Sequence, residues 1–172
     1  MIEIRPARLE DIPELREVAI ASYRDTFTEF NTPENMEAFL STTYSLVKLQ
    51  EEFQEPNSWI FIAWENKQQV GFIRLRETDE VEHTLGKHAL ELHRLYVLTQ
   101  AQGKSVGKKL MEVALAFAND RSYHWIWLGV WERNYRAQEF YAKWGFVRFS
   151  EHTFMMGDDP QVDWLLGKKL RD

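Results

Sequence analysis

The sequence predicts an α/β fold in which a mixed central sheet of about seven strands carries helices on both faces. Strand-like and helix-like segments alternate along the chain, with apolar residues at period two in the former and at helical spacing in the latter. Helices that separate successive strands act as crossover connections, which place them on the faces of the sheet. With 172 residues, of which 44% are hydrophobic, the chain can bury a substantial core.

The N-terminal third predicts one strand followed by three helices. Residues 2–5 alternate in polarity, as is typical of a short strand. Asp11 offers an N-terminal cap and Pro13 suits the first turn of a helix, which the apolar spacing extends to about Phe27. A second helix begins at Pro33, and a third, shorter helix is expected before the next proline.

The middle of the chain predicts a β-hairpin and a long loop. Residues 58–64 are aromatic and β-branched, residues 65–69 are polar enough for a turn, and residues 70–76 form the returning strand. Residues 77–88 are polar and mostly acidic. We expect this last segment to form a long functional loop.

The C-terminal half alternates between strands and helices. Strands are expected at residues 89–98, 124–130, 146–149 and 162–170, and helices at residues 104–119 and 134–144. No internal repeat, low-complexity tract or linker is visible. Residues 1–172 are therefore expected to form one domain.

The composition excludes several classes of site and of protein. The sequence contains no cysteine, which rules out disulfides, cysteine-ligated zinc, iron–sulfur clusters and thiol nucleophiles, and no metal site is expected. The net charge of −6 argues against a general nucleic-acid binder. No apolar stretch approaches the ~20 residues of a membrane span, and the N-terminus lacks the pattern of a signal peptide. A soluble cytoplasmic protein is the expectation.

A polar loop between a strand and a helix is the sharpest local feature. The strand ends at residues 95–98, and the loop of residues 99–108 contains two glycines and leads into the helix. The first N–H groups of a helix lack internal partners and the helix dipole adds positive potential, so this place suits a phosphate. Lys104, Lys108 and Lys109 are expected to cluster there. The alternative is a basic loop without a ligand, and the spacing fits neither a Walker A loop nor a dinucleotide fingerprint.

This loop and a second motif resemble the two central motifs of the GCN5-related N-acetyltransferases, the GNAT superfamily. The family pattern Gln/Arg-x-x-Gly-x-Gly/Ala is matched by residues 102–107, and Asn-x-x-Ala-x-x-x-Tyr is matched by Asn134, Ala137 and Tyr141, followed by Gly145-Phe146. The resemblance extends over essentially the whole chain. It implies the GNAT fold, with a mixed, mostly antiparallel sheet, and acetyl-CoA as the co-substrate.

The resemblance also implies which residues hold acetyl-CoA. The loop would bind the pyrophosphate, and the second motif would line the pantetheine arm, with Asn134 also suited to cap its helix. Ser105 departs from the family, which usually has a glycine there; a serine costs on the order of 1 kcal/mol in strain or adds a hydroxyl hydrogen bond. The implied cofactor-binding residues are Leu95, Tyr96, Val97, Gln102, Gly103, Lys104, Ser105, Val106, Gly107, Lys108, Asn134, Ala137 and Tyr141.

The expected chemistry is direct attack of an amine on acetyl-CoA within a ternary complex. The sequence has no cysteine and no G-x-S-x-G elbow, so a covalent acyl-enzyme is not expected. The resemblance implies that Tyr141 is the general acid for the departing thiolate, and a phenol of pKa ~10 is protonated at neutral pH. The alternative is that Tyr141 only packs beside Phe140 and Trp144.

Glu91 is the candidate general base. It precedes Gln102 by the spacing at which some members of the family place a basic glutamate on the same strand. A carboxylate is poorly matched to an ammonium, so burial or a water relay would have to assist. Strand alternation places His93 on the same face as a second candidate, with a structural histidine as the alternative. Arg94 is expected to point the other way and to pair with an acid.

The acyl acceptor is expected to be a small cationic amine. Segments within residues 26–36, 126–132 and 152–158 resemble the PaiA-type branch of the family, which is known for acetylating polyamines such as spermidine and spermine. A peptide or aminoglycoside amine is the alternative acceptor. A non-catalytic regulatory module that binds acetyl-CoA is the alternative function. The oligomeric state stays open, with a homodimer among the alternatives. The sequence also contains two acidic clusters, one of Glu77, Asp79, Glu80 and Glu82 and the other of Asp158, Asp159 and Asp163. Either cluster would attract a cation if it lies near the acceptor, and the alternative is that both are solvated loops.

Overall fold

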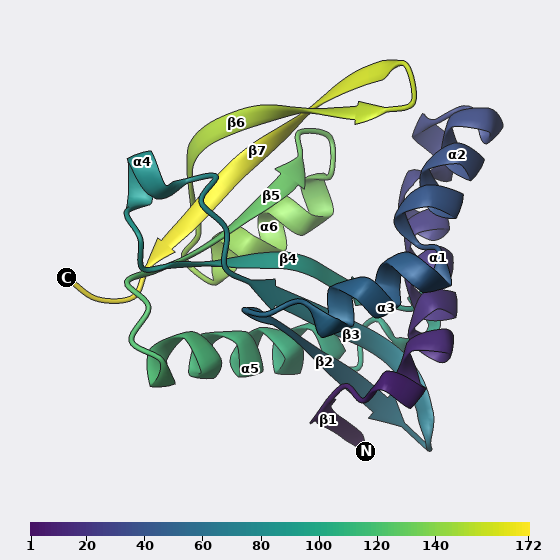
Figure 1. Cartoon of the computed structure of the whole chain (residues 1–172), viewed down its shortest axis with the longest axis horizontal. Helices are drawn as coiled ribbons and strands as arrows, with labels where there is room; N and C mark the ends of the chain where they lie inside the picture. The colour runs from purple at the N-terminus through teal and green to yellow at the C-terminus, as the bar shows by residue number, and fades with distance from the viewer.

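The computed structural model describes residues 1–172, and its centre is one seven-stranded sheet in the order β1-β2-β3-β4-β5-β7-β6 (Figure 1). All neighbouring strands are antiparallel except β4 and β5, which run parallel. The mixed, mostly antiparallel sheet that the sequence predicts is confirmed. The strands are β1 (Ile2–Pro6), β2 (Ser58–Glu65), β3 (Gln68–Arg76), β4 (Ala89–Val97), β5 (Trp125–Trp131), β6 (Val147–Met156) and β7 (Asp159–Lys169).

Helices cover both faces of this sheet. The helices α1, α2 and α3 pack on one face and α5 and α6 on the other, while the short α4 belongs to the segment that connects β3 to β4 (Figure 1). None of the helices combines the length and the apolar character that crossing a bilayer would require. The helices are α1 (Ile12–Phe27), α2 (Pro33–Thr43), α3 (Leu46–Gln54), α4 (Glu82–Leu85), α5 (Val106–Asp120) and α6 (Tyr135–Lys143), with 3-10 turns η1 (Leu9–Asp11), η2 (Thr28–Phe30) and η3 (Thr99–Ala101).

The core has two apolar layers, one on each face of the sheet. Ile73 and Leu75 of β3 pack in the layer with Leu110 of α5, and Phe72 of β3 packs in the layer with Ile12 of α1. Because successive side chains of a strand point to opposite faces, a central strand supplies both layers. This two-sided burial explains why β3 is mostly apolar rather than strictly alternating.

The sheet opens between β4 and β5. These strands pair only at Ala89/Trp125, Leu90/Ile126 and Glu91/Trp127, after which β4 continues beside β3 and β5 beside β7. A β-bulge interrupts β4 just beyond the last pair: Leu92 and Arg94 face consecutive residues of β3, which leaves His93 as the extra residue. The strands therefore separate toward their carboxyl ends.

Most predicted elements are confirmed, but several differ in extent from the expectation, among them the last strand, which begins at Asp159 and not at residue 162. The strand expected at 146–149 extends to Met156, because β6 is an edge strand that pairs only with β7 and its mostly exposed side chains need not be apolar. The helix expected from residue 104 begins at Val106, since Ser105 before it has a left-handed backbone. The loop expected at 77–88 contains α4.

Candidate active site

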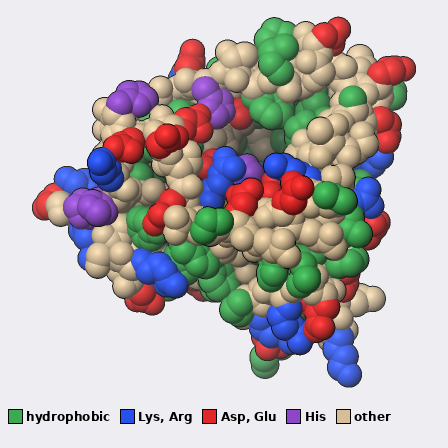
Figure 2. Space-filling model, in the orientation of Figure 1, with side chains coloured by type: hydrophobic (Ala, Val, Ile, Leu, Met, Phe, Trp, Pro, Cys, Tyr) green, Lys and Arg blue, Asp and Glu red, His purple; other side chains and the backbone are tan.

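A cavity of about 770 Å³ opens where β4 and β5 separate. Its walls come from α1, β4, the loop that leads into α5, β5 and α6. Figure 2 shows a hollow in the middle of this face, with charged side chains and histidine gathered beside it. Every predicted cofactor-binding residue lines the cavity except Lys104. The sequence motifs, which are far apart along the chain, thus meet at one place.

The loop before α5 presents unpaired backbone donors to the cavity. None of the N–H groups of residues 103–108 donates a hydrogen bond to another protein group. Gly103 and Ser105 both have positive φ, 81° and 65°, which turns the backbone around this point. A run of free N–H groups at the start of a helix fits an anionic group such as a phosphate. The Ser105 hydroxyl makes no capping hydrogen bond.

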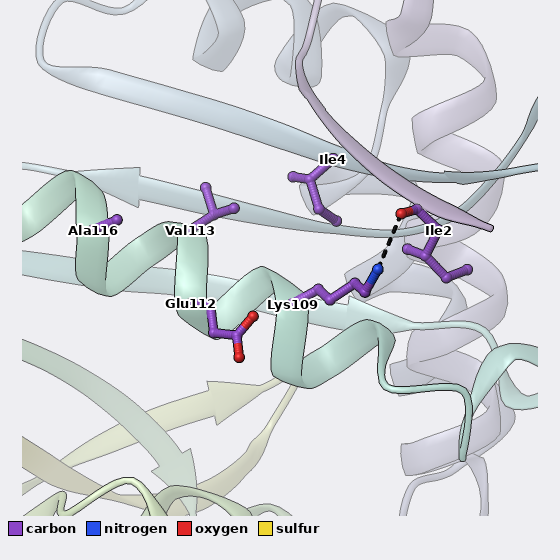
Figure 3. Close-up of a pocket in the computed structure, with 6 residues that line it drawn as sticks. All are labelled: Ile2, Ile4, Lys109, Glu112, Val113 and Ala116. Carbon is purple, nitrogen blue, oxygen red and sulfur yellow. Dashed lines mark hydrogen bonds between the residues drawn. The ribbon is translucent and has the colours of Figure 1, made fainter.

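The three lysines of this region do not act together, in contrast to the expectation. Lys108 lines the cavity, whereas Lys104 lies 3.0 Å from the Glu65 carboxylate. Lys109 extends to the other side of α5, where its Nζ lies 3.3 Å from the Ile2 carbonyl oxygen (Figure 3). Because successive residues of a helix point in different directions, Lys108 and Lys109 cannot both face one ligand, and Lys104 precedes the helix. Arg136, which sequence reasoning missed, lines the cavity from the first turn of α6, and Arg94, which pairs with Glu52, lines it as well.

Helix α6 presents the second motif to the cavity. Asn134 caps the helix, its Oδ1 accepting from the Ala137 N–H at 3.2 Å, as the sequence predicts. The Tyr141 side chain is buried and lines the cavity, and its hydroxyl makes no hydrogen bond to protein. Burial raises the pKa of Tyr141 above that of a free phenol, so the hydroxyl remains a proton donor at neutral pH. Gly145, with φ of 87°, ends the helix and returns the chain to the sheet.

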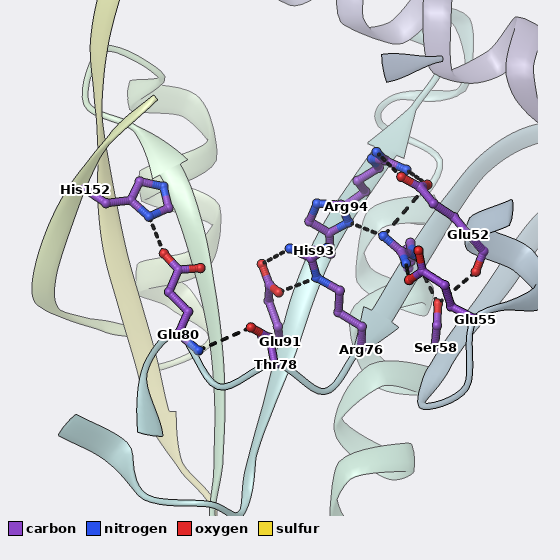
Figure 4. A network of polar contacts seen from close by, with 11 residues as sticks. Glu52, Glu55, Ser58, Arg76, Thr78, Glu80, Glu91, His93, Arg94 and His152 are labelled. Carbon is purple, nitrogen blue, oxygen red and sulfur yellow. Dashed lines mark hydrogen bonds and ion pairs between the residues drawn. The ribbon is translucent and has the colours of Figure 1, made fainter. Parts of the chain in front are cut away.

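Glu91 is buried, and its carboxylate is held by Arg76. The Arg76 Nε donates to Glu91 at 2.6 Å and its Nη2 donates at 3.3 Å (Figure 4). Burial raises the pKa of Glu91, and the hydrogen bonds and charge of Arg76 oppose that rise. Glu91 is not among the residues that line the cavity, so its predicted role as general base stays a prediction.

The bulge at His93 changes which residues of β4 share a face. His93 lines the cavity, as expected for a candidate catalytic residue. Arg94 was expected opposite to Glu91, and this is wrong: the extra residue shifts the alternation, so both side chains lie on the face covered by α3. The expectation that Arg94 pairs with an acid is confirmed, because its Nη1 lies 2.5 Å from Glu52.

A buried ionic network supports this part of β4 (Figure 4). Its central member is Arg74, which is 1% exposed and donates to Glu55 at 2.6 Å, to Ser58 at 3.1 Å and to His93 Nδ1 at 2.9 Å. Sequence reasoning missed Arg74, although a charged residue within an otherwise apolar strand is a visible signal. The network immobilises the guanidinium group that His93 contacts.

Only one member of each predicted acidic cluster, Glu80 and Asp163, is brought together, and both contact the same histidine. His152 of β6 lies between Glu80 and Asp163, with Nδ1 at 2.5 Å from the former and Nε2 at 3.3 Å from the latter. Asp163 lies next to the cavity wall, because a Cβ atom on Gly129 would be 3.7 Å from its carboxylate oxygen. Most of the other acids are peripheral; Glu77, for example, accepts from the Tyr123 hydroxyl.

Aromatic side chains line the part of the cavity between α1 and β5. The rings of Phe27 and Trp131 lie with centroids 5.7 Å apart, and both residues line the cavity. Asp25, in the last turn of α1, lines the cavity as well, and its carboxylate accepts from the Thr99 hydroxyl at 2.6 Å, next to the loop that leads into α5. The cavity wall thus includes both an aromatic pair and a negative charge from the end of α1.

Known proteins share this architecture over the full chain. The crystal structure of the PaiA N-acetyltransferase from Thermoplasma acidophilum, in complex with coenzyme A, superposes with a TM-score of 0.83 at 26% identity and covers 99% of each chain. The structure of the ribosomal-protein-S18-alanine N-acetyltransferase from Escherichia coli has a TM-score of 0.71 at 16% identity, which shows the fold alone.

Sequence relatives give the same result. An uncharacterized N-acetyltransferase of Lactobacillus delbrueckii subsp. lactis is 36% identical over 165 residues, 94% of this chain and 93% of that protein. The spermidine N(1)-acetyltransferase of Thermoplasma acidophilum is 30% identical over 149 residues, 84% of this chain and 88% of that protein. Residues 18–146 match the acetyltransferase (GNAT) family. The chain therefore belongs to the GNAT family and is an acetyl-CoA-dependent N-acetyltransferase.

Proposed function

We propose that the chain transfers the acetyl group of acetyl-CoA to a primary amine of a small polycation, such as spermidine or spermine, by direct attack in a ternary complex. The observation that carries the proposal is the cavity between β4 and β5, which has free N–H groups at the loop before α5 and acids on or beside its walls. The spermidine N(1)-acetyltransferase from Thermoplasma acidophilum, 30% identical to this chain, supports the acceptor class.

Acetyl-CoA has a fitting place in this cavity. The pyrophosphate lies at the N–H groups of residues 103–108, with Lys108 and Arg136 as neighbouring cations. The pantetheine arm runs between β4 and α6, past Asn134 and Ala137. This direction brings the thioester toward the bulge of β4, where the two strands stop pairing. The crystal structure of the PaiA relative in complex with coenzyme A supports the assignment of the ligand.

The reaction needs a neutral amine, a polarised carbonyl and a proton for the departing sulfur. Tyr141 supplies that proton in our proposal, because its hydroxyl is free of protein partners and protonated at neutral pH. Since the chain has no cysteine, proximity and orientation of amine and thioester supply much of the acceleration without an acyl-enzyme. Glu91 is proposed to accept the amine proton through a water relay, because it does not line the cavity itself.

The acceptor enters on the side of the cavity that lies between α1 and β5. Asp25 on one wall and Asp163 behind Gly129 provide negative charge, which attracts ammonium groups. Phe27 and Trp131 provide an apolar wall against which the methylene chain of a polyamine packs. This combination favours an alkyl polycation over an acidic peptide.

A thiol-release assay with acetyl-CoA and an acceptor panel tests the proposal. The panel contains spermidine, spermine, amino acids, peptides and aminoglycosides, and we expect the highest kcat/KM with a polyamine. Turnover with peptides or aminoglycosides but not polyamines would reject the acceptor class. Binding of acetyl-CoA without release of CoA for any acceptor would instead favour a non-catalytic regulatory module.

A further inference from the structure

The hydrogen bond between Arg74 and His93 determines where the imidazole carries its proton. The Arg74 Nη1 lies 2.9 Å from His93 Nδ1. A guanidinium group only donates hydrogen bonds, so Nδ1 must accept and cannot carry a proton. The ring is therefore neutral, with its single proton on Nε2.

The surroundings of His93 maintain this state. Arg74 is itself immobilised by Glu55 and Ser58, so it cannot turn away from the imidazole. Burial and the nearby arginines lower the pKa of His93 well below its ordinary value, which excludes the imidazolium form at neutral pH. The charged groups that surround the ring are Arg74 and Arg76 of β3, Glu91 and Arg94 of β4, Glu52 of α3, and Glu55 directly after α3 (Figure 4).

His93 occupies the bulge at which the cavity begins. It is the extra residue of β4, located directly beyond the last pair between β4 and β5, and it lines the cavity. With Nδ1 engaged by Arg74, the opposite edge of the ring, which carries Nε2–H, is the only one free for a ligand. A neutral imidazole held in this way can donate a hydrogen bond but cannot accept a proton at Nε2.

We propose that His93 is a catalytic hydrogen-bond donor, whose Nε2–H polarises the thioester carbonyl of acetyl-CoA, and that Arg74 is the positioning residue that fixes its tautomer. In this proposal His93 donates a hydrogen bond and keeps its proton, so it is not a general base. It rests on the proposed position of acetyl-CoA in the cavity, but it does not depend on the identity of the acceptor.

The step balances as follows for any amine acceptor. The nitrogen forms a C–N bond with the carbonyl carbon, and the resulting oxyanion accepts the Nε2–H hydrogen bond. The carbonyl then re-forms as the C–S bond breaks. The nitrogen loses its proton to Glu91 through the proposed water relay, and the sulfur takes the Tyr141 proton. Glu91 then releases a proton to solvent and the phenolate regains one from solvent, so that both groups return to their starting states. His93 keeps its proton throughout.

The tautomer is measured directly by ¹⁵N NMR of the histidine-labelled protein. The His93 signals are assigned by their loss in His93→Gln, and we expect a neutral ring with its proton on Nε2 from about pH 6 to 8. Arg74→Gln is expected to mix the two neutral tautomers, and Arg74→Lys, which restores a donor, to recover the original one. A protonated Nδ1 in the wild-type protein would overturn the proposal.

Polarisation is measured by infrared spectroscopy of bound acetyl-CoA labelled with ¹³C at the carbonyl. We expect the carbonyl stretch to lie at lower frequency than in free acetyl-CoA, and to return toward the free value in His93→Ala. His83→Gln, a change at an exposed histidine of α4, is the matched control and should leave the shift intact. An equal shift in the wild type and His93→Ala would overturn the proposal even if both bind acetyl-CoA.

Kinetics separate a donor from a base. Losing one such donor is expected to lower kcat by about 10²–10³, and by the same factor for amines of high and of low pKa. His93→Gln, whose amide can donate, should retain more activity than His93→Ala. A loss that disappears with low-pKa amines would identify His93 as a base. If no polyamine is turned over, the acceptor class fails while the NMR and infrared readouts still decide the role of His93.

Discussion

Ser105 has a left-handed backbone, with φ of 65°, at the position where the family usually has a glycine. Its hydroxyl caps nothing, so the side chain contributes no visible contact to the loop. Replacing it with glycine relieves strain of about 1 kcal/mol but adds comparable freedom to the unfolded chain. Ser105→Gly is therefore expected to change the KM for acetyl-CoA by no more than a few-fold, and the midpoint of thermal unfolding only slightly.

Ser105→Ala separates strain from ligation at the same position. Alanine keeps the Cβ atom and the backbone strain but removes the hydroxyl. We expect its KM for acetyl-CoA to match that of the wild type. A KM raised tenfold or more in both variants would mean that the hydroxyl is a phosphate ligand, and would contradict the interpretation of Ser105 as a tolerated departure.

Tyr141→Phe tests the proposed general acid. The phenyl ring preserves packing against Phe140 and Phe146, so the KM for acetyl-CoA should change little while kcat falls by about 10²-fold. Because burial raises the pKa of Tyr141, the wild-type kcat should not decline through about pH 9 to 10, where an ordinary phenol begins to ionise. Full turnover by the variant, measured by thiol release, would remove Tyr141 from the mechanism.

The sequence could identify individual residues of the cavity but not all of their orientations. The motif spacing predicts the loop at residues 102–107 and the helix with Tyr141, and these do meet in the structure. The bulge could not be read from the strand pattern, because one inserted residue reverses every later side chain without changing the composition. Hence Arg94 was assigned to the wrong face, and the contact of Arg74 with His93 was not foreseen.

At the scale of elements, local patterns predicted most helices and strands because each buries a periodic apolar face. The helix at 12–27 is confirmed at both ends, because Pro13 and the apolar spacing predict the same helix. The edge strand β6 was truncated in the prediction, because exposure removes its pattern beyond Phe149. The separation of β4 from β5 is a property of strand pairing, which no single segment encodes.

His152 joins three elements, namely β6, β7 and the loop before α4. Burial lowers the pKa of His152, but the bonds and charges of Glu80 and Asp163 outweigh this, so the pKa is raised above 6.5. When folding raises the pKa of a histidine, its charged form contributes to the stability of the folded state. This contribution is fully present below the pKa of the unfolded state and is lost as pH rises through the pKa of the folded state. Burial also raises the pKa of Asp163, and the hydrogen bond and charge of His152 oppose that rise.

His152→Gln is accordingly expected to destabilise the protein more at about pH 6 than at about pH 8.5. The ring is partly exposed, so solvent screening limits the difference to about 1 kcal/mol or less. Denaturant unfolding at the two pH values measures it, with His83→Gln as the exposed control. An equal loss at both values would mean that His152 contributes packing and not charge.

At the scale of the whole molecule, the net charge of −6 is unevenly distributed around the cavity. Lys108 and Arg136 line the cavity in which the phosphates are proposed to bind, and Asp163 lies behind Gly129, on the side where the acceptor is proposed to enter. The two proposed ligand positions thus differ in the charge of their neighbours. Surface charges act over a Debye length of about 10 Å at 0.1 M salt, so this division should depend on ionic strength.

Asp25→Asn tests whether an acid of the cavity wall attracts the acceptor, and it should preserve the fold because an asparagine oxygen can still accept from the Thr99 hydroxyl. We expect its KM for a polyamine to rise by about two- to five-fold at low salt, and the difference from the wild type to shrink as salt increases. Asp120→Asn, which removes the same charge at the far end of α5, should leave the KM unchanged. If the KM for a polyamine changes neither in Asp25→Asn nor with salt, the acids of the cavity do not attract the acceptor. An uncharged or peptide amine would then fit this side better.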